Sequence, residues 1–258
     1  MVDYSSYLLE ISKYQRVKLG ETERSSLIKI MNAPKSVHKI ASYFKLKRQQ
    51  AAPYKNKYDY ASIKILQDIN LIEGVQEQKF LSGATYYQLT TWGLFYVLSN
   101  MVNYPPQLFI KYQDNIILKT LLYSYFEVDT IKHCTSRLYS VITQYLHECC
   151  NVTLARLDTI KSITDIKDKD RSVKGLELDL TWHAKTLGFN IAVMYNESHI
   201  LTTNPDVINE NAKVALYELE SDMKILLSRD TRFMQFLQLV QKEFEDGYRE
   251  LTKLKSEK

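Results

Sequence analysis

Apolar residues recur at steps of three and four along most of this 258-residue chain, which is the spacing of one face of an α-helix. The clearest interruption is the segment NLIEGVQEQKFLSGATYYQLTTWG, residues 70–93. Within it, LIEGV and TYYQL are typical of two short strands, and the loop between them contains Gly83. The pattern therefore predicts a mainly α-helical protein with one small β-hairpin.

Three helices are expected ahead of the hairpin. The first begins at Glu23 with ERSSLIKIMN, and Ser36 is a suitable N-cap for the second, VHKIASYF. The third covers residues 59–69, DYASIKILQDI, after a basic loop with the sequence KLKRQQAAPYKNKY. Asn70 lies where a helix often ends in the left-handed conformation. After the hairpin, Thr90 or Thr91 is expected to cap a fourth helix, WGLFYVLSNMV.

Charge is distributed unevenly. The chain carries +4 overall, but residues 1–102 hold 14 Lys and Arg against 8 Asp and Glu, and the remainder holds 20 against 22. Residues 35–64 alone contain eight basic residues and one acid, Asp59. Such a local excess indicates a surface that binds a polyanion, although a solvated lysine-rich face has the same composition.

Three pieces, SVHKIASYF, YASIKILQDINLIEG and YYQLTTWG, occur in the order helix, recognition helix with its exit, returning strand and cap. In this order they resemble the winged-helix (helix-turn-helix) transcription regulators of archaea and bacteria, over about residues 22–102. The resemblance implies duplex DNA as the partner, with the third helix in the major groove. Ahead of this region, residues 1–21 are expected to form an N-terminal arm or helix.

The resemblance implies a DNA-binding role for ten residues. Basic residues before the third helix and in the wing would contact phosphates, and the exposed side of the helix would face the bases. They are Lys45, Lys47, Arg48, Lys55, Lys57, Tyr58, Ala61, Ser62, Lys64 and Lys79, with Ile65 on the same exposed side. Because the start of the helix lacks Arg, Asn and Gln, the usual readers of guanine and adenine, we expect contacts mainly to the DNA backbone.

Beyond a proline-containing hinge, NYPPQ at residues 103–107, residues 108–258 are expected to form an all-helical domain. Asp129 is expected to cap a helix that runs to about Cys150, and KDKDRSVKG to form a charged loop. Apolar residues at alternating steps of four and three then predict a coiled-coil-like helical hairpin over residues 206–255, with a break near Arg229 and Asp230. We expect this hairpin to form a homodimer, since such regulators act on paired half-sites.

Several classes of function receive no support from the sequence. Glycines are too scattered for a phosphate-binding loop. His133 and His147 would lie about 21 Å apart on one helix, which is too far to share an ion. We therefore expect no cofactor, no metal and no enzyme activity. The three cysteines, the absence of a secretory leader and the shortness of the apolar runs favour a cytoplasmic protein without a membrane span.

Two alternatives to a DNA-binding regulator stay open. The winged helix could be a protein-interaction module or scaffold. Alternatively, the aromatic-rich region at residues 108–195 could enclose a small apolar effector, which would make the protein a ligand-sensing regulator.

Overall fold

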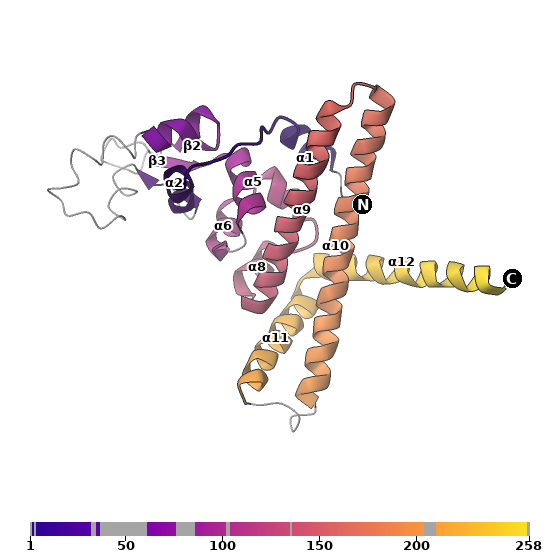
Figure 1. Ribbon diagram of the computed structural model, residues 1–258. Helices are drawn as coiled ribbons and strands as arrows, with labels where there is room; N and C mark the ends of the chain where they lie inside the picture. Colours follow the sequence, from indigo (N-terminus) through magenta and orange to yellow (C-terminus); the bar gives the residue numbers. More distant parts are fainter. Residues whose placement is uncertain are drawn as a thin grey trace. The chain divides into compact units, whose positions relative to one another are not determined.

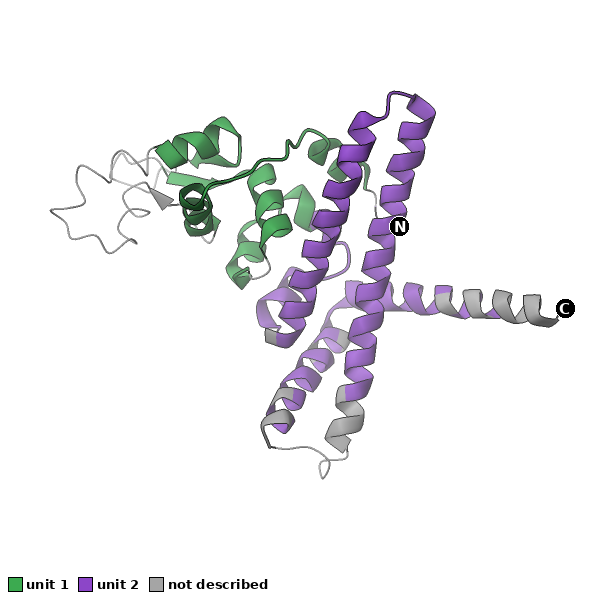
Figure 2. Ribbon diagram, viewed as in Figure 1, with its two compact units in different colours: residues 1, 3–118 green, residues 2, 119–258 purple. Residues whose placement is uncertain are grey.

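The computed structural model describes residues 2, 4–31, 35–36, 61–75, 86–101, 104–134, 136–203 and 210–256. As expected, these residues are mainly helical, with one small antiparallel sheet (Figure 1). The chain forms two compact units, unit 1 up to Leu118 and unit 2 from Lys119 onward (Figure 2). No helix among the described residues is both long enough and apolar enough to span a bilayer.

The boundary between the units lies after the proline-containing segment at 103–107 instead of within it. The reason is hydrogen bonding back into unit 1. Tyr104 donates its hydroxyl to the carbonyl of Leu98 at 2.6 Å, and the hydroxyl of Tyr112 accepts from the backbone N–H of Leu89 at 2.9 Å. Residues 108–118 thus belong to unit 1, although the sequence indicated that the helical domain begins at 108.

Unit 1 contains seven elements that the structure describes in full and one described in part. The full elements are α1 (Ser5–Ile11), α2 (Glu21–Met31), β1 (Lys35–Ser36), β2 (Ile72–Val75), β3 (Tyr86–Leu89), α5 (Thr91–Asn100) and α6 (Pro106–Lys111). Residues 61–68 are also helical and are called the 61–68 helix below. A further helix, α7 (Ile116–Leu121), carries the chain from unit 1 into unit 2.

The sheet confirms the predicted hairpin. β2 and β3 pair antiparallel, with Ile72 opposite Leu89 and Val75 opposite Tyr86. The short strand β1 adds to the other edge of β3, which gives the order β1-β3-β2. Ser36, expected as a helix cap, lies in β1; the helix that it would cap and the basic loop after it fall outside the described residues.

The N-terminal segment is part of the core of unit 1. Tyr7 and Ile11 of α1 are completely buried. Tyr14 packs edge-on against Phe95 of α5, with ring centroids 5.1 Å apart, and burial raises the pKa of its phenol to about 12. Residues 1–21, expected as an arm or helix, thus contain a helix that contributes to the same core as α5.

The regular secondary structure in the described part of unit 2 consists of helices alone. Its elements after α7 are α8 (Val128–His133), α9 (Ser136–Ser162), α10 (Ile166–Thr203), α11 (Glu210–Arg229) and α12 (Thr231–Ser256). α9 and α10 pack along each other, and α11 lies beside the later part of α10 (Figure 1). At 38 residues, α10 is about 57 Å long.

Two predictions for this unit were wrong. The helix expected to run from Asp129 to Cys150 is interrupted, because the backbone at Cys134 is extended, with φ −71° and ψ 144°. The segment expected as a charged loop, residues 167–175, belongs to α10. The side chain of Asp165 explains this, since it accepts from the N–H groups of Lys167 and Asp168 at 2.8 and 3.1 Å and so caps the helix earlier than expected.

The break at Arg229 and Asp230 is present, but α11 and α12 do not form a hairpin along their length. The apolar positions of α11, such as Leu219, Met223 and Leu226, are buried within unit 2. α12 instead packs its first turns against α10, where Phe236 lies next to Gly188, and then diverges from α11 (Figure 1). The seam of α11 is therefore not available for a homodimer.

Asp230 connects the start of α12 to the start of α8. Its carboxylate is 1% exposed and accepts three hydrogen bonds. Oδ1 accepts from the N–H of Phe233 at 2.9 Å, which caps α12. Oδ2 accepts from the N–H of Glu127 at 2.9 Å and from the hydroxyl of Thr130 at 2.6 Å, which caps α8 from a distant part of the chain. The cap expected at Asp129 is thus supplied by Asp230.

We predict that Asp230→Ala destabilises the protein by about 3 kcal/mol or more, because it removes two caps and leaves buried donors without an acceptor. Denaturant unfolding measures the change. Asp129→Ala is the matched control, since the side chain of Asp129 is exposed and pairs with the neighbouring Lys132. Its denaturation midpoint should stay close to that of the wild type, and equal effects of the two substitutions would contradict the role of Asp230.

Candidate nucleic-acid interface

The 61–68 helix is the described part of the expected DNA-reading helix. Ala61, Lys64 and Ile65 are exposed, as the sequence predicted, and Ile65 is 44% exposed. Ser62 was predicted on the same side but is buried, at 2% exposure. It lies four residues before the fully buried Leu66, so both side chains occupy the inward face of the helix. Ser62 is therefore removed from the set of candidate DNA contacts.

The other seven candidates lie outside the described residues. They are Lys45, Lys47, Arg48, Lys55, Lys57, Tyr58 and Lys79. On the 61–68 helix itself, Lys64 is balanced by the exposed Asp68. The positive excess that a polyanion would require thus comes from the sequence around this helix and not from the helix alone.

The end of the helix is fixed by a Schellman-type motif. Asn70 adopts a left-handed conformation with φ 57°, as predicted. The N–H of Leu71 donates to the carbonyl of Leu66, and the N–H of Asn70 donates to the carbonyl of Gln67, both at 2.8 Å. This pair of bonds satisfies the last helical carbonyls, and the buried Leu71 and Leu66 supply the hydrophobic contact that accompanies the motif.

Thr90 ties this helix end to the start of α5. Its N–H donates to the carbonyl of Leu71 at 3.1 Å, and its hydroxyl donates to the carbonyl of Asn70 at 2.6 Å. The same hydroxyl accepts from the N–H of Gly93 at 3.0 Å, which is the predicted N-cap of α5. We call this contact, formed by Asn70, Leu71, Thr90 and Gly93, the exit clasp.

Gly93 lets the two backbones of the exit clasp approach. A Cβ atom on residue 93 would lie 1.9 Å from the carbonyl oxygen of Leu71. This oxygen belongs to the backbone and cannot rotate away. Any residue larger than glycine at position 93 would therefore have to displace the end of the 61–68 helix or the start of α5. The clasp therefore fixes the orientation of the 61–68 helix relative to the rest of unit 1.

Two clefts adjoin these elements. One, of about 430 Å³, is lined by Ile65, Val17, Leu19 and Ile69 and also by the charged Lys18 and Glu23; we call it the apolar cleft, since most of its lining side chains are apolar. The other, of about 380 Å³, is polar and adjoins the exit clasp. Tyr112 lines the polar cleft, and burial raises the pKa of its phenol to about 12. Its hydroxyl is the group that accepts the hydrogen bond from the N–H of Leu89.

The region proposed for an effector, residues 108–195, contributes to an open cleft of about 340 Å³ between α9 and α10 in unit 2. Its lining mixes polar side chains, such as Gln144, Glu148 and Asn190, with apolar ones such as Val141 and Met194. This mixture differs from the small apolar enclosure that the ligand-sensing alternative requires.

The cysteines are buried or half-buried thiols. Among the described residues, no group of three or more His, Cys, Asp or Glu is placed to hold a metal ion. Burial raises the pKa of Cys134 and of Cys149 to about 12, and raises that of Cys150 well above its ordinary value. These side chains are therefore neutral thiols at ordinary pH, whereas a nucleophilic cysteine needs the thiolate.

We predict that Gly93→Ala destabilises the protein by about 1–3 kcal/mol, because the added methyl group overpacks the exit clasp. Gly175→Ala is the matched control: its Cβ would meet nothing within 4 Å, and alanine in a helix should stabilise by about 0.5–1 kcal/mol. Thermal unfolding of both variants measures the difference. A Gly93→Ala variant as stable as the wild type would show that the clasp is loosely packed.

Comparisons with known proteins find no match: no protein family fits the chain, and neither a curated protein nor a solved structure is detectably similar.

Proposed function

We propose that the protein binds duplex DNA through unit 1, mainly by contacts to backbone phosphates, and acts as a homodimeric transcription regulator. The observation that carries this proposal is the exit clasp together with the hairpin. An exposed helix face is held rigidly by Asn70 and Thr90, and an antiparallel hairpin follows it directly.

The order of the described elements supports the proposal. α2, the 61–68 helix, strands β2 and β3 and the Thr90-capped α5 occur in the order that the winged-helix resemblance implies, with β1 following α2; the second helix that the resemblance requires falls outside the described residues. A helix that reads DNA needs one face on the protein core and one face open. Ile63 and Leu66 supply the first, and Ala61, Lys64 and Ile65 supply the second.

Charge supports backbone contacts. Six lysines and an arginine among the candidate residues give about seven phosphate contacts per protomer (Lys45, Lys47, Arg48, Lys55, Lys57, Lys64 and Lys79). Each contact releases a condensed counterion, so the logarithm of the binding constant should fall with the logarithm of salt concentration with a slope of about −6 per protomer.

Fluorescence anisotropy with a random-sequence duplex, measured across salt concentrations, tests this prediction. The variant that replaces Lys47, Arg48, Lys55 and Lys57 with glutamate should lose binding, because four attractive charges become repulsive. Binding that does not depend on salt would refute the proposal, and so would a four-glutamate variant that still binds.

A protein-interaction function is the second candidate, and Ile65 favours it. This side chain is 44% exposed beside the apolar cleft, and an exposed isoleucine next to an apolar hollow is a typical anchor site for a protein partner. If no duplex binds even at low salt, protein interaction is better supported than DNA binding.

The substitution Ile65→Lys distinguishes DNA binding from protein interaction. If the helix faces DNA, the added charge should make the salt slope steeper by about one and keep or tighten the affinity. Leu239→Lys is the matched control, since Leu239 is exposed on α12 in unit 2 and should leave the slope unchanged. An unchanged slope for Ile65→Lys would mean that this face of the helix does not meet DNA.

A further inference from the structure

The segment between α1 and α2, residues 12–20, reaches the exposed side of the 61–68 helix. Val17 and Leu19 of this segment line the apolar cleft together with Ile65 of the helix. From the sequence, residues 1–21 are expected only as an arm or helix ahead of the DNA-binding domain. The shared cleft instead places the end of this segment on the same surface as the helix that is proposed to meet DNA.

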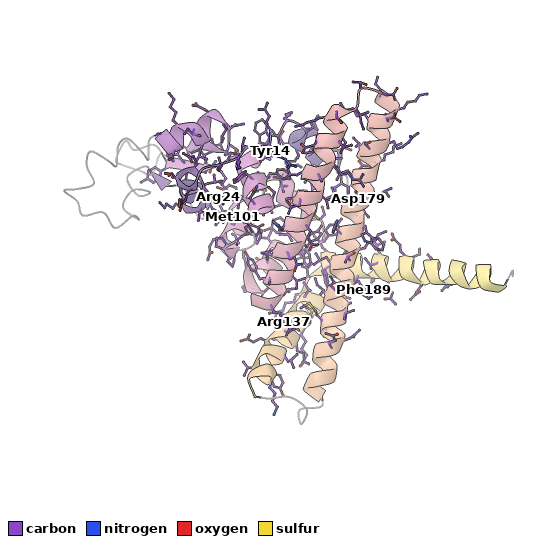
Figure 3. The ribbon with its side chains drawn as sticks, viewed as in Figure 1. Tyr14, Arg24, Met101, Arg137, Asp179 and Phe189 are labelled. Carbon is purple, nitrogen blue, oxygen red and sulfur yellow. The ribbon has the colours of Figure 1, made fainter. Side chains whose placement is uncertain are left out.

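The core of unit 1 holds this segment in place. Tyr14, labelled in Figure 3, is 3% exposed and packs against Phe95 of α5, and Leu19 is 7% exposed. The phenol of Tyr14 also hydrogen-bonds to the backbone of Val17. The residues between the two buried side chains therefore have a fixed position. A side chain that they present to a ligand is ordered in advance, which lowers the entropic cost of binding.

Lys18 is the cation that this fixed segment presents beside the helix. Its side chain is exposed and lines the apolar cleft. Within the part of the chain that the structure describes, Lys18 forms no ion pair. The acid in the same lining, Glu23, extends over Gly20, since a Cβ atom on residue 20 would lie 2.5 Å from its Oε2. An ammonium group that no carboxylate neutralises can bind a phosphate and release its counterion.

We propose that Lys18 contacts a backbone phosphate of the duplex that the 61–68 helix meets, so that residues 17–20 form one flank of the DNA-binding surface. This inference rests on the proposed DNA binding and adds a contact outside the ten candidate residues. Lys18 contributes affinity and not sequence preference, because a phosphate contact carries no information about the bases. Glu23, at the same edge, opposes the phosphate.

Fluorescence anisotropy of the full chain with a random-sequence duplex, across salt concentrations, tests this contact. Lys18→Gln should weaken binding and make the salt slope shallower by about 0.9, because one fewer counterion is released. Lys18→Arg keeps the charge and should keep the slope. Glu23→Gln should tighten binding, because it removes a repulsive charge. Lys174→Gln is the matched control, since Lys174 is exposed on α10 in unit 2 and should leave the slope unchanged.

A photo-cross-link gives an independent measure of position. Lys18→Cys, labelled with a benzophenone maleimide and irradiated with the duplex, should attach to DNA. The wild type treated in the same way is the control, since its own cysteines are buried or half-buried. A Lys18→Gln variant with the wild-type slope, or a labelled residue 18 that does not attach, would overturn the contact of Lys18 and leave DNA binding in place. A wild type that binds no duplex at low salt would overturn both.

Discussion

The buried carboxylate of Asp230 is the interaction on which the helical unit depends. Asp230 directly follows α11, and its carboxylate, which is 1% exposed, caps α12 and binds the start of α8. Stacking of Phe126 on Phe233, with centroids 5.1 Å apart, places apolar packing directly beside these polar bonds. A buried carboxylate is tolerable only when its oxygens are satisfied, and here each oxygen accepts at least one hydrogen bond.

A smaller contact of the same kind organises unit 1. The exit clasp joins the end of the 61–68 helix to the start of α5 through one threonine side chain and one glycine without a Cβ atom. A binding surface built on rigid elements keeps its geometry when a ligand arrives, which lowers the entropic cost of binding. The clasp therefore gives the exposed face of this helix a fixed direction, whether its partner is DNA or a protein.

The two units expose different kinds of surface. Unit 1 carries the exposed face of the 61–68 helix and adjoins the basic sequence. Unit 2 instead exposes three large apolar side chains of α10, Leu178, Trp182 and Phe189.

Local patterns in the sequence determined much of this protein: the hairpin, the left-handed Asn70, the cap at Thr90 and the break before Asp230. Each depends on residues a few positions apart, whose spacing and chemistry can be read directly. Only the tertiary structure decided which acid caps α8, because Asp230 and Glu127 are far apart in sequence. It also decided that Ser62 faces inward, that α12 leaves α11, and that α10 has an exposed second apolar face. Periodicity shows that a helix has an apolar face, but the packing of the whole chain selects which face is covered.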